Sequence, residues 1–385
     1  MSWNSIIGQG RLINVLRVSL KRGRLGHAYL FTGGEGVGKT ALAIELAKTL
    51  NCEKGGDESC GECPSCRKMD LLQHPNLKLI FSLPVGKNES RGDSPLAKLS
   101  DDEVAIVREQ LALKAKNRYV AITIPRANEI KVNSIRELRR EAALAPADRG
   151  KKVFLIIDAE SMNDESSNAL LKTLEEPHSS TMIILTSSRP DNLLPTIRSR
   201  CQHLRFDPLR EDDIEQALIE REDVDATQAR LVARLAKGSF TKALEYTHSS
   251  LADRRKEAVE FLRTMLFRSR ESVLGEIDRV VREYEKNEID ELLQMLQYWL
   301  RDAMVMTTGM EEAIQPEDRE AVDKFIHRYQ TADFDAAIPA IDRAISLLYK
   351  NVYIPLVLMD LAQTLKRSLD PESVGEKSPR PVREL

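Results

Sequence analysis

Apolar residues are spaced in two different ways along this chain. In the first two hundred residues, short apolar runs alternate with segments of helical periodicity, which is the pattern of a parallel sheet covered by helices on both faces. Strands are expected at 28–32, 77–81, 153–158 and 182–187. The last two runs are almost entirely apolar and therefore predict strands in the interior of the sheet.

A helix is expected between those last two strands, over residues 164–175. Its leucines share one face, and Pro177 disfavours helical backbone at the residue before it. An earlier stretch, 84–118, has a looser pattern, in which polar residues and glycines precede a helix expected near 101–113. We interpret this stretch as an insertion on the surface.

After residue 208 the pattern changes to helical periodicity alone. A first short stretch, 209–248, is too small to hold much core, and long amphipathic helices follow over 249–368. A stripe of this kind is typical of a domain core, and the alternative is a face buried in an oligomer. The tail, 369–385, is rich in proline and charge and is expected to be disordered. The clearest stripe consists of Ile289, Leu293, Leu296 and Leu300.

Composition and charge limit the possible functions. The chain has 385 residues, with 57 basic and 60 acidic side chains and a formal net charge of −3. That length predicts two or three domains, and that charge argues against a protein that grips duplex DNA alone. No signal-peptide pattern opens the chain and no apolar run reaches membrane-spanning length, so we expect a cytoplasmic protein without a membrane segment.

A phosphate-binding pattern, GxxxxGK[ST], is filled at every position from Gly33 to Thr40. Its glycines, Gly33, Gly36 and Gly38, allow a tight curl that points backbone N–H groups at phosphate oxygens. Lys39 adds a cation near the β- and γ-phosphates, and Thr40 offers a hydroxyl to Mg²⁺. The pattern predicts a site for ATP or ADP with magnesium, and leaves open whether the nucleotide is hydrolysed.

Four of the five cysteines are crowded into a short segment just after the phosphate-binding pattern. In a reducing cytosol such a cluster indicates a metal rather than disulfides. Four thiolates make a closed tetrahedral zinc site, which is structural because it leaves no open position for water. The alternative is a set of unrelated thiols, because the first gap is longer than in common zinc fingers. The expected ligands are Cys52, Cys60, Cys63 and Cys66.

Two polar residues end expected strands on the side where the γ-phosphate would lie. Asp158 stands where a carboxylate can hold Mg²⁺ through water. Thr186 stands where it can sense the γ-phosphate, although an ordinary strand-end hydrogen bond explains it equally well. In a hydrolysing protein of this architecture a glutamate usually follows the aspartate, but here Ala159 follows and Glu160 comes one residue later. We expect the water-orienting carboxylate to be misplaced or absent.

Several segments, taken together, resemble one family. They cover most of the chain except 84–118 and the tail, and the Leu-Glu-Glu-Pro and Ser-Arg-Cys segments are the most specific of them. The family is the delta-prime subunits of the bacterial DNA polymerase III clamp loader, which are AAA+ proteins. The matching segments are Ile7-Gly8-Gln9, His27-Ala28-Tyr29-Leu30-Phe31, the cysteine cluster, 168–177 with Leu174-Glu175-Glu176-Pro177, 194–201 with Ser199-Arg200-Cys201, and Trp299-Leu300-Arg301-Asp302.

The resemblance implies a fold of the class α/β plus all-α. An AAA+ nucleotide-binding domain with a P-loop parallel sheet is expected at 1–208, and it contains the zinc module at 52–66. A small helical lid at 209–248 and a helical collar for oligomerisation at 249–368 would follow it.

The resemblance also implies partners and a role in DNA replication. The family forms a five-membered ring that places the sliding clamp on primed DNA, with gamma/tau-type ATPase subunits and a delta subunit as neighbours. In the family, the arginine of the Ser-Arg-Cys segment reaches the neighbouring subunit's ATP, so Arg200 is implied as a finger acting in trans. Arg198 is the competing candidate, and a surface arginine paired with an acidic neighbour is the alternative interpretation.

The chain departs from the motor subunits of the same ring in its lid. Their Gly-Ser-x-Arg segment contacts bound nucleotide, whereas this chain has Thr241 at the arginine's place and Lys242 after it. We therefore expect a delta-prime-type subunit that binds ATP weakly or statically, has little or no ATPase activity, and serves a neighbour's site. The alternatives are a gamma/tau-type motor that hydrolyses ATP itself, and a zinc-containing P-loop protein that binds DNA on its own.

Overall fold

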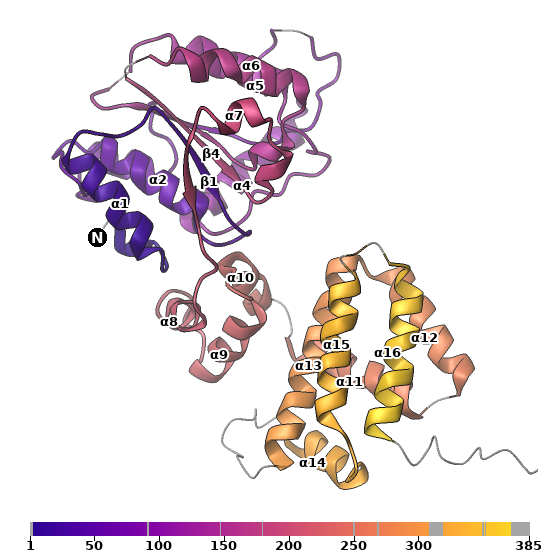
Figure 1. The fold of residues 1–385 in the computed structure, drawn as a ribbon. Coiled ribbons are helices and arrows are strands. Elements are labelled where there is room, and N and C mark those ends of the chain that lie inside the picture. Colours follow the sequence, from indigo (N-terminus) through magenta and orange to yellow (C-terminus); the bar gives the residue numbers. More distant parts are fainter. Residues whose placement is uncertain are drawn as a thin grey trace, which may run out of the picture. The chain divides into compact units, whose positions relative to one another are not determined.

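The computed structural model describes residues 3–370 apart from 91, 147, 179, 249, 250, 268, 308–318, 349 and 351. The chain divides into two compact units, Met1–Tyr246 and Thr247–Leu385. The first holds a parallel sheet with helices on both faces, and in the second every described element of secondary structure is a helix (Figure 1). The predicted class, α/β plus all-α, is confirmed.

The sheet has five parallel strands in the order β2-β3-β4-β1-β5. The two strands expected in the interior each have a neighbour on both sides, and every residue of each is buried. The fifth strand was not predicted, because it is a polar edge strand with exposed side chains and carries no apolar run. The strands are β1 (Ala28–Thr32), β2 (Leu77–Ile80), β3 (Lys152–Ile156), β4 (Thr181–Ser187) and β5 (Gln202–Arg205).

Different helices cover the two faces of this sheet. Helix α2 packs on one face, while α5 and α6 bury their apolar residues on the other (Figure 1). Helix α6 has the bounds expected from the sequence, and Asn163 caps its first turn by accepting the Ser166 N–H. The helices of this part are α1 (Gly10–Lys21), α2 (Lys39–Leu50), α3 (Pro64–Asp70), α4 (Asp101–Lys116), α5 (Val132–Ala142), α6 (Asp164–Glu175) and α7 (Pro195–Arg198), with short 3-10 turns at Trp3–Ser5, Ala159–Ser161 and Pro190–Asn192.

The insertion at 84–118 contains the predicted helix, which is α4. Ser100 begins it with a capping box, in which its hydroxyl accepts the Glu103 N–H while the Glu103 carboxylate accepts the Ser100 N–H. The expectation that the insertion lies on the surface stays a prediction, and two residues at and just after its end are buried. Lys114 is 5% exposed, and Tyr119, which directly follows the insertion, is also 5% exposed.

Three short helices follow the sheet, and longer helices form the second unit. The stripe predicted from Ile289 to Leu300 is buried throughout, because it faces the helices that pack around α13. The predicted domain boundaries stay a prediction, and the expected tail lies outside the described residues from 371 onward. The helices are α8 (Glu211–Glu222), α9 (Ala226–Leu235), α10 (Phe240–His248), α11 (Leu251–Phe267), α12 (Arg270–Glu283), α13 (Lys286–Thr307), α14 (Arg319–Arg328), α15 (Phe334–Leu348) and α16 (Ile354–Leu369).

None of the helices in the described part of the chain has the length and apolarity needed to cross a lipid bilayer.

Candidate functional site

The phosphate-binding pattern forms a loop between the end of β1 and the start of α2. Gly36 and Gly38 have φ values of +72° and +97°, a region of backbone space that residues with a side chain rarely adopt. Gly38 is the N-cap of α2, so the free N–H groups of the first helical turn lie beside the loop. The local geometry is that of an anion site at a helix N-terminus.

Lys39 is folded into this loop and is only 6% exposed. Its ammonium group donates to the carbonyl oxygens of Gly33, at 2.7 Å, and Gly34, at 2.6 Å. Burial lowers the pKa of Lys39, and the carboxylates of Asp158, Glu160 and Glu35 partly oppose that shift. Thr40 follows it in the first turn of α2 and is half-buried. A cation and a hydroxyl therefore lie at the helix start, as the pattern predicts.

Asp158 and Thr186 lie together at the carboxyl ends of neighbouring parallel strands. The Asp158 N–H donates to the Thr186 hydroxyl at 3.1 Å, and Thr186 is fully buried in β4, in register with Phe31 of β1. Burial raises the pKa of Asp158, and the nearby charge of Glu160 raises it further. The fold thus gathers the two strand-end residues near Lys39, although the Thr186 hydroxyl already has a backbone partner.

Glu160 is held by the loop that follows β4. One carboxylate oxygen accepts the backbone N–H groups of Ser188, at 2.9 Å, and Arg189, at 3.1 Å. Burial alone would raise the pKa of Glu160, but hydrogen bonds from its own backbone N–H and from Ser187, together with those from Ser188 and Arg189, hold it below its usual value. The other carboxylate oxygen is buried without a protein partner among the described residues. This carboxylate ties two loops together instead of standing free beside the phosphate loop.

Arg200 lies on the surface just after α7. Its guanidinium forms an ion pair with Glu175 at 2.6 Å and donates to the Thr196 carbonyl at 2.9 Å. The side chain remains 35% exposed. The competing residue, Arg198, pairs with Asp191 at 2.8 Å. Sequence reasoning did not identify Glu175 as the partner of Arg200, although both belong to the segments that carry the family resemblance.

The lid contacts the phosphate loop through backbone rather than through a cationic side chain. The Phe240 N–H donates to the Gly36 carbonyl at 3.0 Å. Thr241, at the position of the motor subunits' arginine, donates its hydroxyl to the Tyr119 carbonyl. Lys242 is exposed. At this position of the described lid, the loop therefore faces Thr241 and not a guanidinium.

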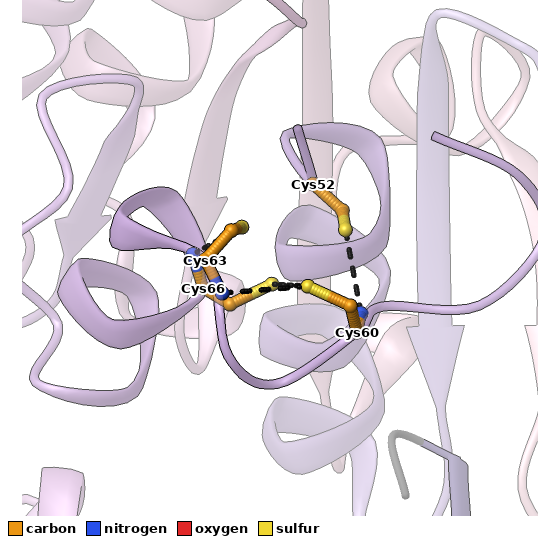
Figure 2. Close-up of side chains that lie close together, drawn as sticks. All are labelled: Cys52, Cys60, Cys63 and Cys66. Atoms are coloured by element: carbon orange, nitrogen blue, oxygen red, sulfur yellow. Dashed lines mark hydrogen bonds between the residues drawn. The ribbon is translucent and has the colours of Figure 1, made fainter. Parts of the chain in front are cut away.

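The four clustered cysteines converge at the start of α3 (Figure 2). Their sulfur atoms all lie within 4.8 Å of one another, and the Cys60 and Cys66 sulfurs are 3.9 Å apart. Sulfurs around a tetrahedral zinc are about 3.8 Å apart, given a Zn–S bond of about 2.3 Å. Backbone N–H groups of Cys60, Cys63 and Cys66 donate to sulfurs of the cluster at 3.3–3.4 Å.

Those hydrogen bonds would stabilise thiolate charge, so the four residues fit a zinc ion. The remaining cysteine, Cys201, packs against the apolar core instead, and burial raises the pKa of its thiol to about 12.

Comparison with known proteins identifies relatives of this chain. Residues 8–210 match the model of a family described as DNA polymerase III, delta subunit. The chain is 29% identical to DNA polymerase III subunit delta' of Bacillus subtilis over 312 residues, which are 80% of this chain and 81% of that protein. It is 33% identical to subunit tau of Escherichia coli over 254 residues, which are 64% of this chain and only 32% of that protein.

Among solved structures, a DNA polymerase III gamma-subunit-related protein from Thermotoga maritima aligns with a TM-score of 0.38 and 14% identity. The alignment covers 92% of this chain and 99% of that one.

Proposed function

Because the chain belongs to the DNA polymerase III delta-subunit family, whose members are clamp-loader subunits, we propose that it is a delta-prime-type subunit. In this role it caps the loader ring and donates Arg200 to the ATP site of a neighbouring subunit. Its own phosphate loop holds nucleotide weakly or statically, and its own ATPase activity is weak or absent.

One observation carries this proposal most directly: Arg200 lies at the surface, whereas Glu160, the carboxylate two residues after Asp158, is bonded to the protein's own backbone. Arg200 is held at the surface by Glu175 and Thr196, with a third of its side chain exposed. Glu160, by contrast, is bonded to the backbone of Ser188 and Arg189. The partly exposed guanidinium of Arg200 can reach the ATP site of a neighbouring subunit. The carboxylate of Glu160, which accepts two backbone N–H groups, is poorly placed to orient a water molecule.

The chemistry that Arg200 would supply is electrostatic. When the γ-phosphoryl group of ATP is transferred, negative charge spreads over its equatorial oxygens, and an arginine supplied by a neighbour stabilises that charge. The planar guanidinium can donate two parallel hydrogen bonds, which a lysine cannot reproduce. Arg200 therefore acts on the neighbour's substrate, and no proton needs to leave this chain.

A nucleotide bound to this chain itself would be held by the residues of the phosphate loop and by two residues at strand ends. Gly33, Gly36 and Gly38 would shape the backbone cradle, and Lys39 would face the phosphates. Thr40 and Asp158 would hold a magnesium ion, and Thr186 would lie near the terminal phosphate. A bound magnesium would neutralise phosphate charge. Lys39 and Asp158 already influence each other's charge states, which supports their placement in one site.

The cysteine cluster is proposed as a structural zinc site with ligands Cys52, Cys60, Cys63 and Cys66. Four sulfurs at these separations leave no position for water or substrate. The ion would hold the start of α3 against the segment that follows α2. Asp70, at the end of α3, forms an ion pair with Lys48 of α2 at 2.7 Å, so α3 is also tied directly to the phosphate-loop helix.

The partners that this function requires are gamma/tau-type ATPase subunits, a delta subunit and the sliding clamp. Contact with primed DNA would come through the assembled ring, and the work would take place in the cytoplasm. Co-purification of the chain from native extract, followed by mass analysis of intact complexes, tests the assignment. We expect clamp-loader ATPases and polymerase subunits in the complex. Recovery of the chain alone, bound tightly and salt-sensitively to DNA, would contradict it.

A gamma/tau-type motor is the alternative function, and a specific observation favours it. The phosphate loop is complete, and the part of the chain that contains it is 33% identical to a tau subunit. Under this alternative the chain would hydrolyse ATP by itself. The missing glutamate after Asp158 and the missing lid arginine at Thr241 speak against that alternative.

A further inference from the structure

Tyr119, the residue directly after the insertion, reaches the phosphate loop. This residue is 5% exposed, and its hydroxyl accepts the backbone N–H of Ile7 at 2.8 Å. A methyl group placed on Gly38 would lie only 3.0 Å from the same hydroxyl. The phenol therefore lies directly between the start of the chain and the last glycine of the loop.

Tyr119 also contacts the lid. Its ring meets the ring of Phe240 edge to face, with the centroids 5.1 Å apart. Its carbonyl accepts the hydroxyl of Thr241, and the neighbouring Asn117 donates to Glu222 of α8 at 2.9 Å. Tyr119 thus occupies the point where the first residues, the phosphate loop and the lid meet.

A buried ion pair fixes this segment in place. The guanidinium of Arg118, adjacent to Tyr119, bonds to Glu45 of α2 and to Asp70 of α3. Glu45 is only 1% exposed and also accepts the Ser59 hydroxyl at 3.0 Å. Removing one partner of such a buried pair leaves an uncompensated charge. The segment is therefore anchored to the helix that starts at the phosphate loop.

The surroundings of Tyr119 are those that a nucleoside needs. Phosphates held by the loop must carry their nucleoside out beside it, and a purine is bound by aromatic walls and backbone hydrogen-bond donors. The Phe240 ring and the Ile7 N–H provide such groups, and Tyr119 already uses both of them. A purine and the Tyr119 ring would compete for the same partners.

We propose that Tyr119 occupies the nucleoside side of the phosphate loop, so that the segment directly after the insertion sets the affinity of this chain for ATP or ADP. The proposal rests on the nucleotide binding proposed above and gives a role to the segment that directly follows the insertion. Nucleotide binds when the segment carrying Tyr119 moves aside, and the apparent affinity falls in proportion to the fraction of molecules that are open.

Equilibrium binding of Mg-ATP and Mg-ADP to the full-length chain, measured by calorimetry, tests the proposal. Tyr119→Ala should tighten binding about tenfold. Tyr119→Phe, which keeps the ring and loses the bond to Ile7, should tighten it about two- to threefold. The matched control is Tyr29→Phe, because the Tyr29 hydroxyl also accepts a backbone N–H, that of Gly26 at 3.0 Å, at the opposite end of β1. It should leave the affinity unchanged.

Unchanged affinity in both Tyr119 variants would overturn the proposal, and weaker binding would show instead that Tyr119 is a wall for the base. If Tyr119→Ala fails to fold, Tyr119→Phe decides. The tighter binding of the Tyr119 variants must disappear when Lys39→Ala is added, because binding that persists without Lys39 would take place outside the phosphate loop. If no variant binds nucleotide while Arg200 still supports ATPase activity in the assembled ring, the Tyr119 proposal fails and the function in trans stands.

Discussion

The phosphate loop and the end of α7 are two regions that bear on ATP, and they differ in how much of the chain covers them. At the loop, Lys39 is 6% exposed and donates to two loop carbonyls, and Thr241 of the lid bonds to Tyr119 beside the loop. At the end of α7, Arg200 is held by a partly exposed ion pair with Glu175 and by a hydrogen bond to the Thr196 carbonyl. The buried phosphate loop holds Lys39 in place, whereas the exposed Arg200 at the end of α7 can exchange its partners. This contrast is what we expect of a subunit whose contribution to catalysis lies at its surface.

Loss of Arg200 should give the largest effect. In a reconstituted ring, Arg200→Ala should slow ATP hydrolysis at the neighbouring site on the order of 10³-fold, because the charge on the γ-phosphoryl group loses its partner. Single-turnover hydrolysis measures this rate. The fold and nucleotide binding of the variant chain should be unchanged, since the polar partners of the Arg200 side chain among the described residues are Glu175 and Thr196.

The matched control for that experiment is Arg198→Ala, two residues earlier. Arg198 has the same charge and a similar position, and it pairs with Asp191. Because we assign the finger to Arg200, loss of Arg198 should have little effect on ATP hydrolysis by the ring. If Arg198→Ala slows the ring and Arg200→Ala does not, the finger is Arg198 and our assignment is wrong.

Loss of Lys39 should affect the phosphate loop and not the end of α7. Lys39→Ala should weaken nucleotide binding to this chain about 10- to 100-fold, the range for a hydrogen bond to a charged group. The ATPase activity of the assembled ring should stay close to the wild-type level. A ring that stops hydrolysing ATP after this substitution would show that the chain's own nucleotide is part of the cycle.

Loss of the charge on Glu175 should have a smaller effect. Glu175→Gln removes an ion pair that is about half exposed, a kind of interaction that contributes up to about 1 kcal/mol, so the neighbour's ATP hydrolysis should slow by no more than about fivefold. Glu176→Gln, at the next residue, is the control and should have no effect. Equal rates in both variants would show that Glu175 does not position Arg200 for catalysis.

Loss of a cysteine ligand should have the smallest effect on the phosphate loop and on the end of α7. Cys63→Ser should release about one zinc ion per chain, measured by metal analysis of protein purified without chelator. Nucleotide binding should persist, and the ATPase activity of the ring should change little, because the expected ligands lie on neither the loop nor α7. Absence of stoichiometric metal in the wild-type protein would remove the zinc site from the account.

Most of the sheet could be predicted from the sequence, and the reasons are physical. Strands β1, β3 and β4 are buried apolar runs, and α6 has its cap at Asn163 and a proline two residues beyond its end at Glu175, so local signals agree with the fold. The edge strand β5 was missed because its residues are polar and face solvent. Its position depends on pairing with β1, which only the folded sheet provides.

The candidate site could be predicted only in part. The phosphate loop and the cysteine cluster are local in sequence, so their spacing reveals them. The contacts of Tyr119 with Ile7, Gly38 and Thr241 join residues about 80 to 120 positions apart. The pairing of Glu175 with Arg200 likewise depends on how α6 and α7 pack. No spacing rule indicates such contacts.

The most direct test of the central claim is ATP turnover by the purified chain alone. We predict a rate close to background that does not change in Lys39→Ala, because Glu160 is bonded to backbone and the lid has Thr241 in place of an arginine. Robust turnover by the isolated chain that disappears in Lys39→Ala would contradict the account and identify the chain as a motor in its own right.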